Sequence, residues 1–345
     1  EQLLPLRAQP HRPYRIKRQM RLVTAAAINQ ALDVRSLMER LRSAFRDDIA
    51  NPARTLHHIE SSLGPDEPGS GDLMVMPAWV RGTARSGDMS GRRGYIGVKV
   101  QSVFPDNRTK GIPSLTGVYV LMSGRTGEPL GLLDAPTLTA WRTAAASALA
   151  ATYLARQDAE RLLVVARGAL VPDRMKAPAE ARPTADGVIW NRTPATADKL
   201  AKRLTRPDLK VAATTDLEGA VRGADIICTA TGSTQPLVKG EWLQPGVHLD
   251  CVGGYRPDMR EVDDEVVSRA RVFVDTRTGA MSEAGDIVGP LESGAITTED
   301  ITADLHDLAR GDRAGRRYHD QITLFKSVGV ALEDLAAATL AFERT

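Results

Sequence analysis

Apolar residues in the first third of the chain change their period from helical spacing to strand-like runs. Over residues 29–46 they recur every three or four positions, which predicts one helix lying on a core. From Gly94 onward, strands are predicted at GYIGVKVQSVF, GVYVLMS and PLGLLD, and the turn-like GRTGE joins the last two. The first third is therefore expected to be an α+β unit with an antiparallel sheet.

The rest of the chain alternates between helices and strands. Residues 139–158 are alanine-rich and have the composition of a long helix. Helix-like segments then separate the apolar runs RLLVVA, GVIWN, LKVAA, DIICTAT, VHLDCVG and RVFVDT. Such an alternation forms right-handed βαβ units, so an α/β fold with a doubly wound, Rossmann-type parallel sheet is expected. The tail after Arg316 ends in another helix, which we expect to return to the first unit.

A chain of 345 residues exceeds the usual size of a single core, so two domains that share one cleft are expected. The pattern divides the chain into an N-terminal extension (1–19), a first domain (20–137 together with 312–345) and a Rossmann domain (138–311).

Composition and charge exclude several classes of protein. The chain is 42% hydrophobic, and no apolar run approaches the roughly 18 residues of a membrane span, so a soluble protein is expected. The formal net charge is +2, because residues 1–19 carry +4 and the rest of the chain carries −2. The rest of the chain therefore gives no indication of nucleic-acid binding. Residues 1–19 lack the apolar core of a signal peptide. We interpret them as an extension or a misassigned start, with a targeting sequence or basic tail as the alternative.

The two cysteines, Cys228 and Cys251, lie in strand-like apolar runs and are interpreted as small buried thiols. Free thiols favour a cytoplasmic location. No metal site is expected.

The first strand of the alternation ends where a dinucleotide-binding fingerprint, G-x-G-x-x-G/A, would lie. Of that fingerprint, the segment from Ala166 to Val171 keeps only the middle glycine, Gly168, which permits close approach of a pyrophosphate to the backbone. Pro178 falls inside the following helix, where an interior proline costs about 3 kcal/mol. By itself the match leaves nucleotide binding and a plain strand-to-helix turn as open alternatives.

The end of the second strand favours NADP(H) over NAD(H). An NAD-selective site has an acid about 20 residues beyond the glycines, whereas Asn191, Arg192 and Thr193 occupy that place here. Arg192 is suited to pair with a 2′-phosphate, and Asn191 and Thr193 to hydrogen-bond it. A simple N-cap at Thr193 before Pro194 is the alternative, and the two roles can coexist.

Seven blocks of sequence after Met20 resemble the ornithine cyclodeaminase and mu-crystallin family and occur in the family's order. They are MPAW (76–79), GVKV (97–100), FPDN (104–107), LTAWRTAAASALAA (138–151), GGYRPDMRE (253–261), EAGD (283–286) and TLFKSVG (323–329). Several long blocks in register are far more specific than one motif, and the chain is identified as a member on that basis.

The resemblance implies a substrate with an α-carboxylate and a set of catalytic residues. Arg54 and Arg142 match the family's carboxylate clamp, Lys99 its active-site lysine, and Ser114 a residue that helps to position the substrate. Burial of Lys99 within the apolar VKV run would lower its pKa. Without the resemblance, Arg54 reads as an ordinary surface charge and Lys99 as an edge-strand lysine.

The resemblance also implies two further groups of cofactor-binding residues. Gly168, Ala169, Leu170 and Thr231 are expected to contact the dinucleotide along the strand ends, and Lys326, Ser327 and Gly329 to line the nicotinamide. The family also implies a homodimer built on the first domain and the C-terminal helix.

One departure from the family pattern separates its activities. Cyclodeaminases resemble one another in an aspartate directly after the paired glycines, and Tyr255 stands there after Gly253 and Gly254; Asp258 remains a possible substitute. The expected activity is NADPH-dependent reduction of cyclic imino acids, Δ1-pyrroline-2-carboxylate or its six-membered homologue, to L-proline or L-pipecolate. The alternatives are ornithine cyclodeaminase, an alanine dehydrogenase-like enzyme, and a mu-crystallin-like binding protein.

Overall fold

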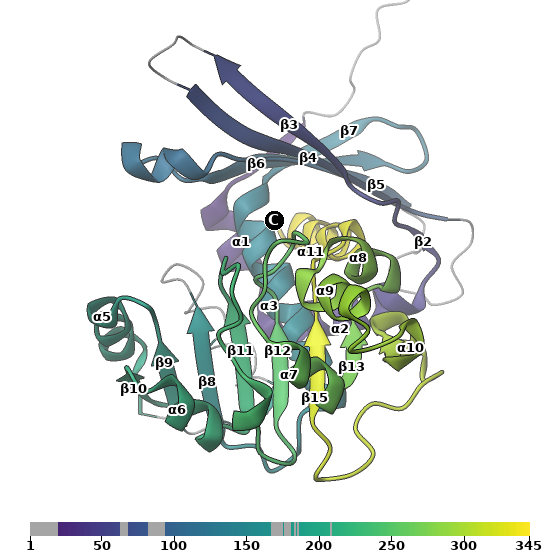
Figure 1. The fold of residues 1–345 in the computed structure, drawn as a ribbon. Helices are drawn as coiled ribbons and strands as arrows, with labels where there is room; N and C mark the ends of the chain where they lie inside the picture. The colour runs from purple at the N-terminus through teal and green to yellow at the C-terminus, as the bar shows by residue number, and fades with distance from the viewer. Residues whose placement is uncertain are drawn as a thin grey trace, which may run out of the picture.

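The computed structural model describes residues 20–62, 68–81, 94–166, 175, 181–182, 184, 186–207 and 209–345 (Figure 1). The N-terminal extension, Gly168, Ala169, Leu170 and Pro178 lie outside these residues. The described strands form two sheets, an upper mixed sheet and a lower parallel one, with helices between them (Figure 1).

The first domain opens with β1 (Arg21–Val23), α1 (Ala25–Ala31) and α2 (Val34–Arg46). The expectation of one helix over 29–46 is wrong, because Asp33 interrupts it. The Asp33 carboxylate accepts a hydrogen bond from the Ser36 amide and caps a new helix, while α1 has its own cap in Thr24. The break leaves Leu37, Leu41 and Phe45 fully buried on the inner face of α2.

The upper sheet has the strand order β1-β7-β6-β5-β4-β2, with β3 paired to β4. All its pairings are antiparallel except that of β1 with β7, so the predicted α+β unit is confirmed with one parallel edge. Its strands are β2 (Ile49–Ala50), β3 (Thr55–Ser62), β4 (Pro68–Val80), β5 (Tyr95–Val103), β6 (Leu115–Ser123) and β7 (Pro129–Asp134), with the 3-10 helix η1 (Pro105–Lys110) before β6.

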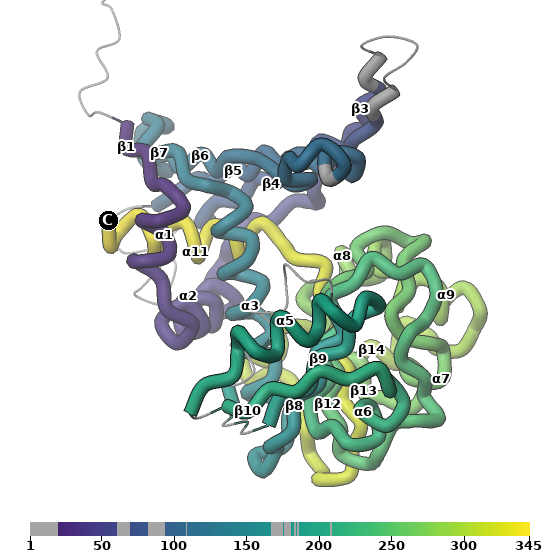
Figure 2. Tube along the Cα trace, turned by 90° about the vertical axis from the view of Figure 1, so that its left-hand side faces the viewer, coloured from purple at the N-terminus to yellow at the C-terminus, as the bar shows by residue number. Residues whose placement is uncertain are grey.

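The pleat of this sheet determines which way Lys99 points. Lys99 on β5 lies opposite Met76 on β4 and Tyr119 on β6, and all three are buried. Opposed residues share a face of a sheet. Lys99 therefore faces the helices α3 (Ala135–Leu154) and α11 (Ala331–Arg344), which lie beneath the sheet in Figure 2.

The lower sheet has the order β10-β9-β8-β11-β12-β15-β13-β14, and every pairing in it is parallel. The predicted doubly wound parallel sheet is thus confirmed. The strands are β8 (Arg161–Ala166), β9 (Asp186–Trp190), β10 (Lys210–Thr214), β11 (Ile226–Ala230), β12 (His248–Cys251), β13 (Arg271–Val274), β14 (Ile301–Asp304) and β15 (Thr323–Lys326). The helical segments that connect them are α5 (Pro194–Leu204), α6 (Leu217–Gly223), η2 (Gly240–Trp242), α7 (Asp264–Arg269), α8 (Arg277–Glu283), α9 (Gly285–Ser293), η3 (Thr298–Asp300) and α10 (Leu305–Arg310).

The C-terminal boundary between the domains differs from the expected position at residue 312. Strand β15 inserts between β12 and β13 in the parallel sheet, so the chain returns to the first domain only with α11. Helix α3 likewise packs in one core with α2 and α11, a core that also contains Phe273 and Phe325 of the parallel sheet. The two sheets thus share a hydrophobic core around α3 and α11.

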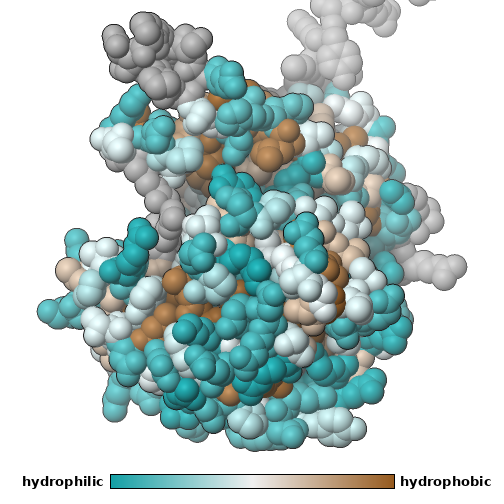
Figure 3. All heavy atoms as spheres, in the orientation of Figure 1, coloured by the Kyte–Doolittle hydropathy of each residue, from teal (hydrophilic) through white to brown (hydrophobic). Residues whose placement is uncertain are grey.

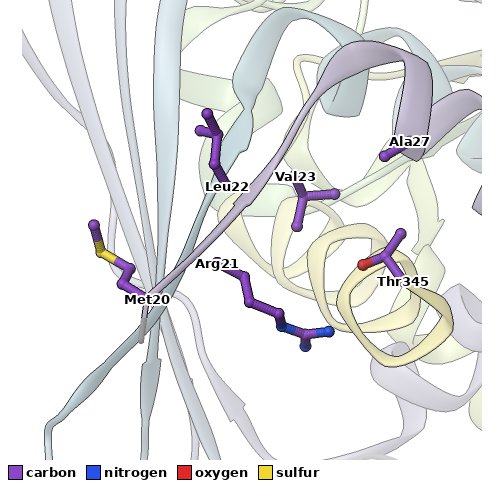
Figure 4. Close-up of a pocket in the computed structure, with 6 residues that line it drawn as sticks. All are labelled: Met20, Arg21, Leu22, Val23, Ala27 and Thr345. Atoms are coloured by element: carbon purple, nitrogen blue, oxygen red, sulfur yellow. The ribbon is translucent and has the colours of Figure 1, made fainter. Parts of the chain in front are cut away.

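The two ends of the described chain meet at the edge of the upper sheet (Figure 4). Arg21 donates a hydrogen bond to the Phe342 carbonyl (2.8 Å), and its guanidinium lies 3.4 Å from the centre of the Phe342 ring. Leu22 points the other way and is 75% exposed. Strand β1 is thereby fastened to the last turn of α11 while its outer side chain faces solvent.

Candidate functional site

A cavity of about 610 Å³ opens at the carboxyl ends of β8, β9 and β11. The chain runs from β8 to β9 and β10 on one side of β8 and then crosses over to β11 on its other side, which makes this the switch point where parallel sheets bind ligands. Apolar side chains are visible over these strands, on a face that is otherwise mostly hydrophilic (Figure 3). The described lining residues are Ala166, Trp190, Asn191, Arg192, Thr193, Thr196, Thr231, Gly232, Ser233, Thr234, Gln235 and Leu237.

The predicted cofactor residues at the end of β9 line this cavity. Asn191 donates a hydrogen bond to the Ala166 carbonyl (2.7 Å) and accepts one from the Thr193 amide (2.9 Å), so it holds the loop in shape. Arg192 is exposed, and no ion pair joins it to another of the described residues. Thr193 precedes α5 without a side-chain capping bond. None of the described lining residues is acidic, and a basic side chain beside a helix N-terminus suits a phosphate.

Thr231, on the other side of the cavity, is held by a buried carboxylate. Glu261 accepts hydrogen bonds from the Thr231 amide (2.6 Å), the Thr231 hydroxyl (2.9 Å) and the Gly253 amide (2.8 Å). Lys326 is fully buried beneath it, with its Nζ 2.8 Å from Oδ2 of Asp286. Burial by itself lowers the pKa of Lys326, but Asp286 and Glu261 outweigh it and raise that pKa, so the lysine stays charged. Its contact with a nicotinamide stays a prediction.

The segment after β15 is shaped by a second buried carboxylate. Oδ2 of Asp275 accepts hydrogen bonds from the Ser327 hydroxyl (2.9 Å), the Val328 amide (2.8 Å) and the Gly329 amide (2.7 Å). Gly329 has φ +78°, and an added Cβ would collide with the Arg142 guanidinium. This turn therefore lies directly against the predicted substrate clamp.

Lys99 and Arg142 meet the first turn of α11 in a buried charge cluster. Lys99 Nζ lies 2.8 Å from Oδ2 of Asp334, and Arg142 Nη1 lies 2.8 Å from Oε2 of Glu333. Arg142 Nε also lies 3.4 Å from Oδ1 of Asp334. Lys99 is only 1% exposed and Arg142 6%. The sequence analysis singled out both cations. It did not single out the two carboxylates that pair with them in the structure.

Arg54 approaches the same segment from the loop before β3. It forms an ion pair with Glu283 at the end of α8 and donates a hydrogen bond to the Val328 carbonyl (3.1 Å). Both predicted clamp arginines therefore have internal partners. Since a guanidinium carries five N–H donors, each retains capacity for a further carboxylate, and the clamp stays a prediction.

Burial and neighbouring charges shift the pKa values in this cluster. Burial, together with the charge of Arg142, lowers the pKa of Lys99 to about 8, although the attraction of Asp334 opposes the shift. Burial raises the pKa of Glu333 to about 7, although Arg142 opposes the shift. For Arg142 burial alone lowers the pKa, but Asp334 and Glu333 prevail and raise it. A cation that stays charged thus lies beside an amine that can lose its proton near neutral pH.

The family model described as ornithine cyclodeaminase/mu-crystallin matches residues 18–345. The chain belongs to the ornithine cyclodeaminase/mu-crystallin family. Protein SAR DEFICIENT 4 of Arabidopsis thaliana is 39% identical over 88% of this chain and 92% of its own length. A Δ1-pyrroline-2-carboxylate reductase of Colwellia psychrerythraea is 33% identical over 94% of this chain and 99% of its own.

A solved structure of the family, the Δ1-pyrroline-2-carboxylate reductase of Thermococcus litoralis in complex with NADH and L-proline, superposes with a TM-score of 0.86. It is 31% identical and covers 94% of this chain and 97% of the other. The predicted family and class of enzyme, an oxidoreductase acting on C=N bonds with a nicotinamide cofactor, are confirmed.

The remaining predicted residues are partly placed. Ser114 lies directly before β6, and its carbonyl accepts a hydrogen bond from the Phe104 amide (2.8 Å); its role stays a prediction. Gly168, Ala169 and Leu170 lie outside the described residues. Cys228 and Cys251 are buried free thiols, as expected. None of the helices in the described parts of the chain is long and apolar enough to cross a membrane.

Sequence reasoning missed the carboxylates of the site. Glu333 and Asp334 lie in ALEDLAAATLAF, where they read as the polar side of an amphipathic helix, yet both are fully buried. The apolar residues around them could have revealed their role. Two adjacent acids in an apolar helix become buried, and buried carboxylates need cations beside them. Three other carboxylates accept hydrogen bonds from backbone amides: Asp275, Glu261 and Asp286. The positions of these acids in the sequence do not indicate which amides they bind.

Proposed function

We propose that this protein reduces cyclic imino acids with NADPH, converting Δ1-pyrroline-2-carboxylate or Δ1-piperideine-2-carboxylate to L-proline or L-pipecolate. The observation that carries the proposal is the convergence of Lys99, Arg142 and Arg54 on the segment 328–334, which links the parallel sheet to α11. A buried amine of lowered pKa beside two arginines suits a substrate with a carboxylate next to a C=N bond. The named reductases among its relatives support the same activity.

Each side chain of the cluster has a separate task in this reaction. The guanidinium groups of Arg54 and Arg142 hold the substrate carboxylate and orient the ring. Lys99 donates a proton to the imine nitrogen. The nicotinamide cofactor, when bound, supplies the hydride that reduces C2.

Three features support NADPH as the preferred cofactor. Arg192 is exposed at the cavity, the N-terminus of α5 follows it, and the described lining has no acid to hold a ribose 2′-hydroxyl. Arg192 and the N-terminus of α5 would hold the negative charge of a 2′-phosphate.

The geometry around Tyr255 favours reduction of a preformed ring over cyclisation of ornithine. Tyr255 is half-buried after the paired glycines, and the candidate substitute, Asp258, is exposed and held by Arg256 through two hydrogen bonds of 3.0 and 2.8 Å. A carboxylate held this way by a guanidinium is a poor acceptor for a substrate ammonium.

We also propose a homodimer formed through the outer face of the upper sheet. An antiparallel sheet with one solvated face alternates apolar and polar residues, whereas here both faces are apolar. One row in register crosses five strands from β1 to β4, and a second row lies beside it; no described helix covers them in Figure 1. The first row is Leu22, Leu132, Val120, Val98 and Pro77, and the second is Val118, Val100 and Val75. A structural relative named as an alanine dehydrogenase dimer supports a second copy as the occupant.

One panel of substrates tests the proposed activity. The purified protein is assayed with NADPH and with NADH against both cyclic imines and against pyruvate with ammonia, and with NADP+ and NAD+ against L-ornithine. We expect rapid reduction of a cyclic imine with NADPH and little ammonia from ornithine. Proline and ammonia formation from ornithine at a comparable rate would establish a cyclodeaminase instead, and reductive amination of pyruvate an alanine dehydrogenase.

A further inference from the structure

Asp334 joins two cations that come from different elements of the fold. Its Oδ2 lies 2.8 Å from Nζ of Lys99 on β5, and its Oδ1 lies 3.4 Å from Nε of Arg142 on α3. The side chains of Lys99 and Asp334 are 2% and 0% exposed, so solvent hardly screens the pair. The first turn of α11 thereby fixes the position of the Lys99 amine.

The other groups that face Lys99 do not replace this carboxylate. Thr139 on α3 accepts a long hydrogen bond from Nζ (3.4 Å), and Arg142 and Arg54 repel the ammonium charge. Tyr119, opposite Lys99 on β6, is buried and neutral, because burial, and then Asp334, raise the pKa of its phenol. On α11, Glu333 is directed to Arg142.

We propose that Asp334 is a positioning residue, the counter-ion that holds the Lys99 ammonium in place and keeps it charged for proton transfer to the imine nitrogen. This inference rests on the proposed function. In the reaction C2 gains a hydride, the π electrons of the C=N bond form a new N–H bond with the Lys99 proton, and Lys99 is left as a neutral amine. Water returns the proton once the product has left.

The expected pH dependence follows from the charges around Lys99. Reduction requires the ammonium, so activity falls as pH rises through the pKa of Lys99, which burial lowers to about 8. Asp334 acts against that lowering. In Asp334→Asn the pKa should fall further, and the alkaline limb of kcat/KM should move down by about one to three pH units.

Glu333→Gln is the matched control. It also removes one buried carboxylate from the same turn, but Glu333 pairs with Arg142 rather than with Lys99. We expect it to raise the KM for the imino acid through the Arg142 clamp and to leave the alkaline limb where the wild type has it. Asp334→Glu keeps the charge on a longer stem, so it should retain the limb and lower kcat.

NMR titration of the Lys99 ammonium signal, assigned with Lys99→Arg, gives a readout that needs no turnover. Wild type should titrate near pH 8 and Asp334→Asn clearly lower, even if the substrate is not a cyclic imine. The inference is overturned if folded Asp334→Asn keeps the wild-type titration, or if Glu333→Gln shifts it equally. If Asp334→Asn does not fold, Asp334→Glu decides: a large fall in the pKa of Lys99 in this variant, which keeps the carboxylate charge, would overturn the inference.

Discussion

Arg192 and Lys99 show how differently the fold uses two basic side chains. Arg192 is exposed at a cavity and has no described ion-pair partner, whereas Lys99 is enclosed and paired with Asp334. An exposed, unpaired guanidinium contributes little to stability, so its effect should appear in ligand binding. A buried ammonium affects stability through its ion pair, because removing one member of such a pair leaves an uncompensated buried charge.

Arg192→Ala should weaken NADPH binding about tenfold or more and leave NADH binding nearly unchanged. The reason is the loss of one charge-assisted contact with the 2′-phosphate, which typically contributes about 1.5 to 3 kcal/mol. Dissociation constants for both cofactors, from fluorescence titration, measure the effect. Arg203→Ala, an exposed arginine at the other end of α5, is the control. Equal weakening of both cofactors would show that Arg192 does not recognise the phosphate.

His248 makes stability depend on pH at a site remote from the charge cluster. It is fully buried at the start of β12, where Nδ1 lies 3.0 Å from the Thr323 hydroxyl, and burial, with a contribution from Arg316, lowers its pKa to about 3. The unfolded chain binds a proton at this group near pH 6.5, and the folded chain does not. The stability contributed by neutral His248 is therefore complete above about pH 6.5 and is lost as pH falls toward about 3.

His248→Gln should remove that part of the pH dependence. Between about pH 6.5 and pH 5 the wild type should lose up to about 1.4 kcal/mol of unfolding free energy per pH unit from this group alone. Urea unfolding of both proteins over this range, at a fixed protein concentration, measures the difference in slope. Parallel slopes would mean that the imidazole takes up its proton without unfolding.

At the scale of elements, the turn between β15 and α11 connects the parallel sheet to the charge cluster. Asp275 holds its amides, Gly329 lets the backbone pass against Arg142, and α11 begins with the two buried acids. A substitution in this turn should therefore affect catalysis without replacing a charged residue.

Gly329→Ala tests this expectation against Gly294→Ala. Both glycines are left-handed, at φ +78° and φ +75°, so either alanine should cost about 1 to 2 kcal/mol of stability. Only at residue 329 does the new Cβ also meet Arg142, while nothing lies within 4 Å at residue 294. We expect kcat/KM to fall about a hundredfold in Gly329→Ala alone. Thermal unfolding and steady-state kinetics separate the two effects, and equal kinetics in both variants would contradict the link.

For the whole molecule, the proposed dimer rests on the outer face of the upper sheet. Val118 is 45% exposed in a single chain, although it lies in an apolar row that extends across the sheet. Val118→Glu should place a charge inside the interface and convert the dimer to a monomer, which light scattering after gel filtration measures. Ile112→Glu, 49% exposed in the loop before β6, should leave the dimer intact. A wild type that is monomeric, or a Val118→Glu variant that stays dimeric, would place the interface elsewhere.

Local patterns in the sequence determined the elements and the family, because helix and strand periods, caps and long motif blocks are properties of neighbouring residues. They were sufficient to predict the parallel sheet, the return of α11 and the buried cysteines, while the catalytic roles of Lys99 and Arg142 stay predictions drawn from the family resemblance. Tertiary structure decided the rest. The insertion of β15 between β12 and β13 and the pairing of Lys99 with Asp334 join residues more than 40 and more than 200 positions apart. Such contacts depend on how layers stack and which charges must be neutralised once buried, and no local pattern contains that information.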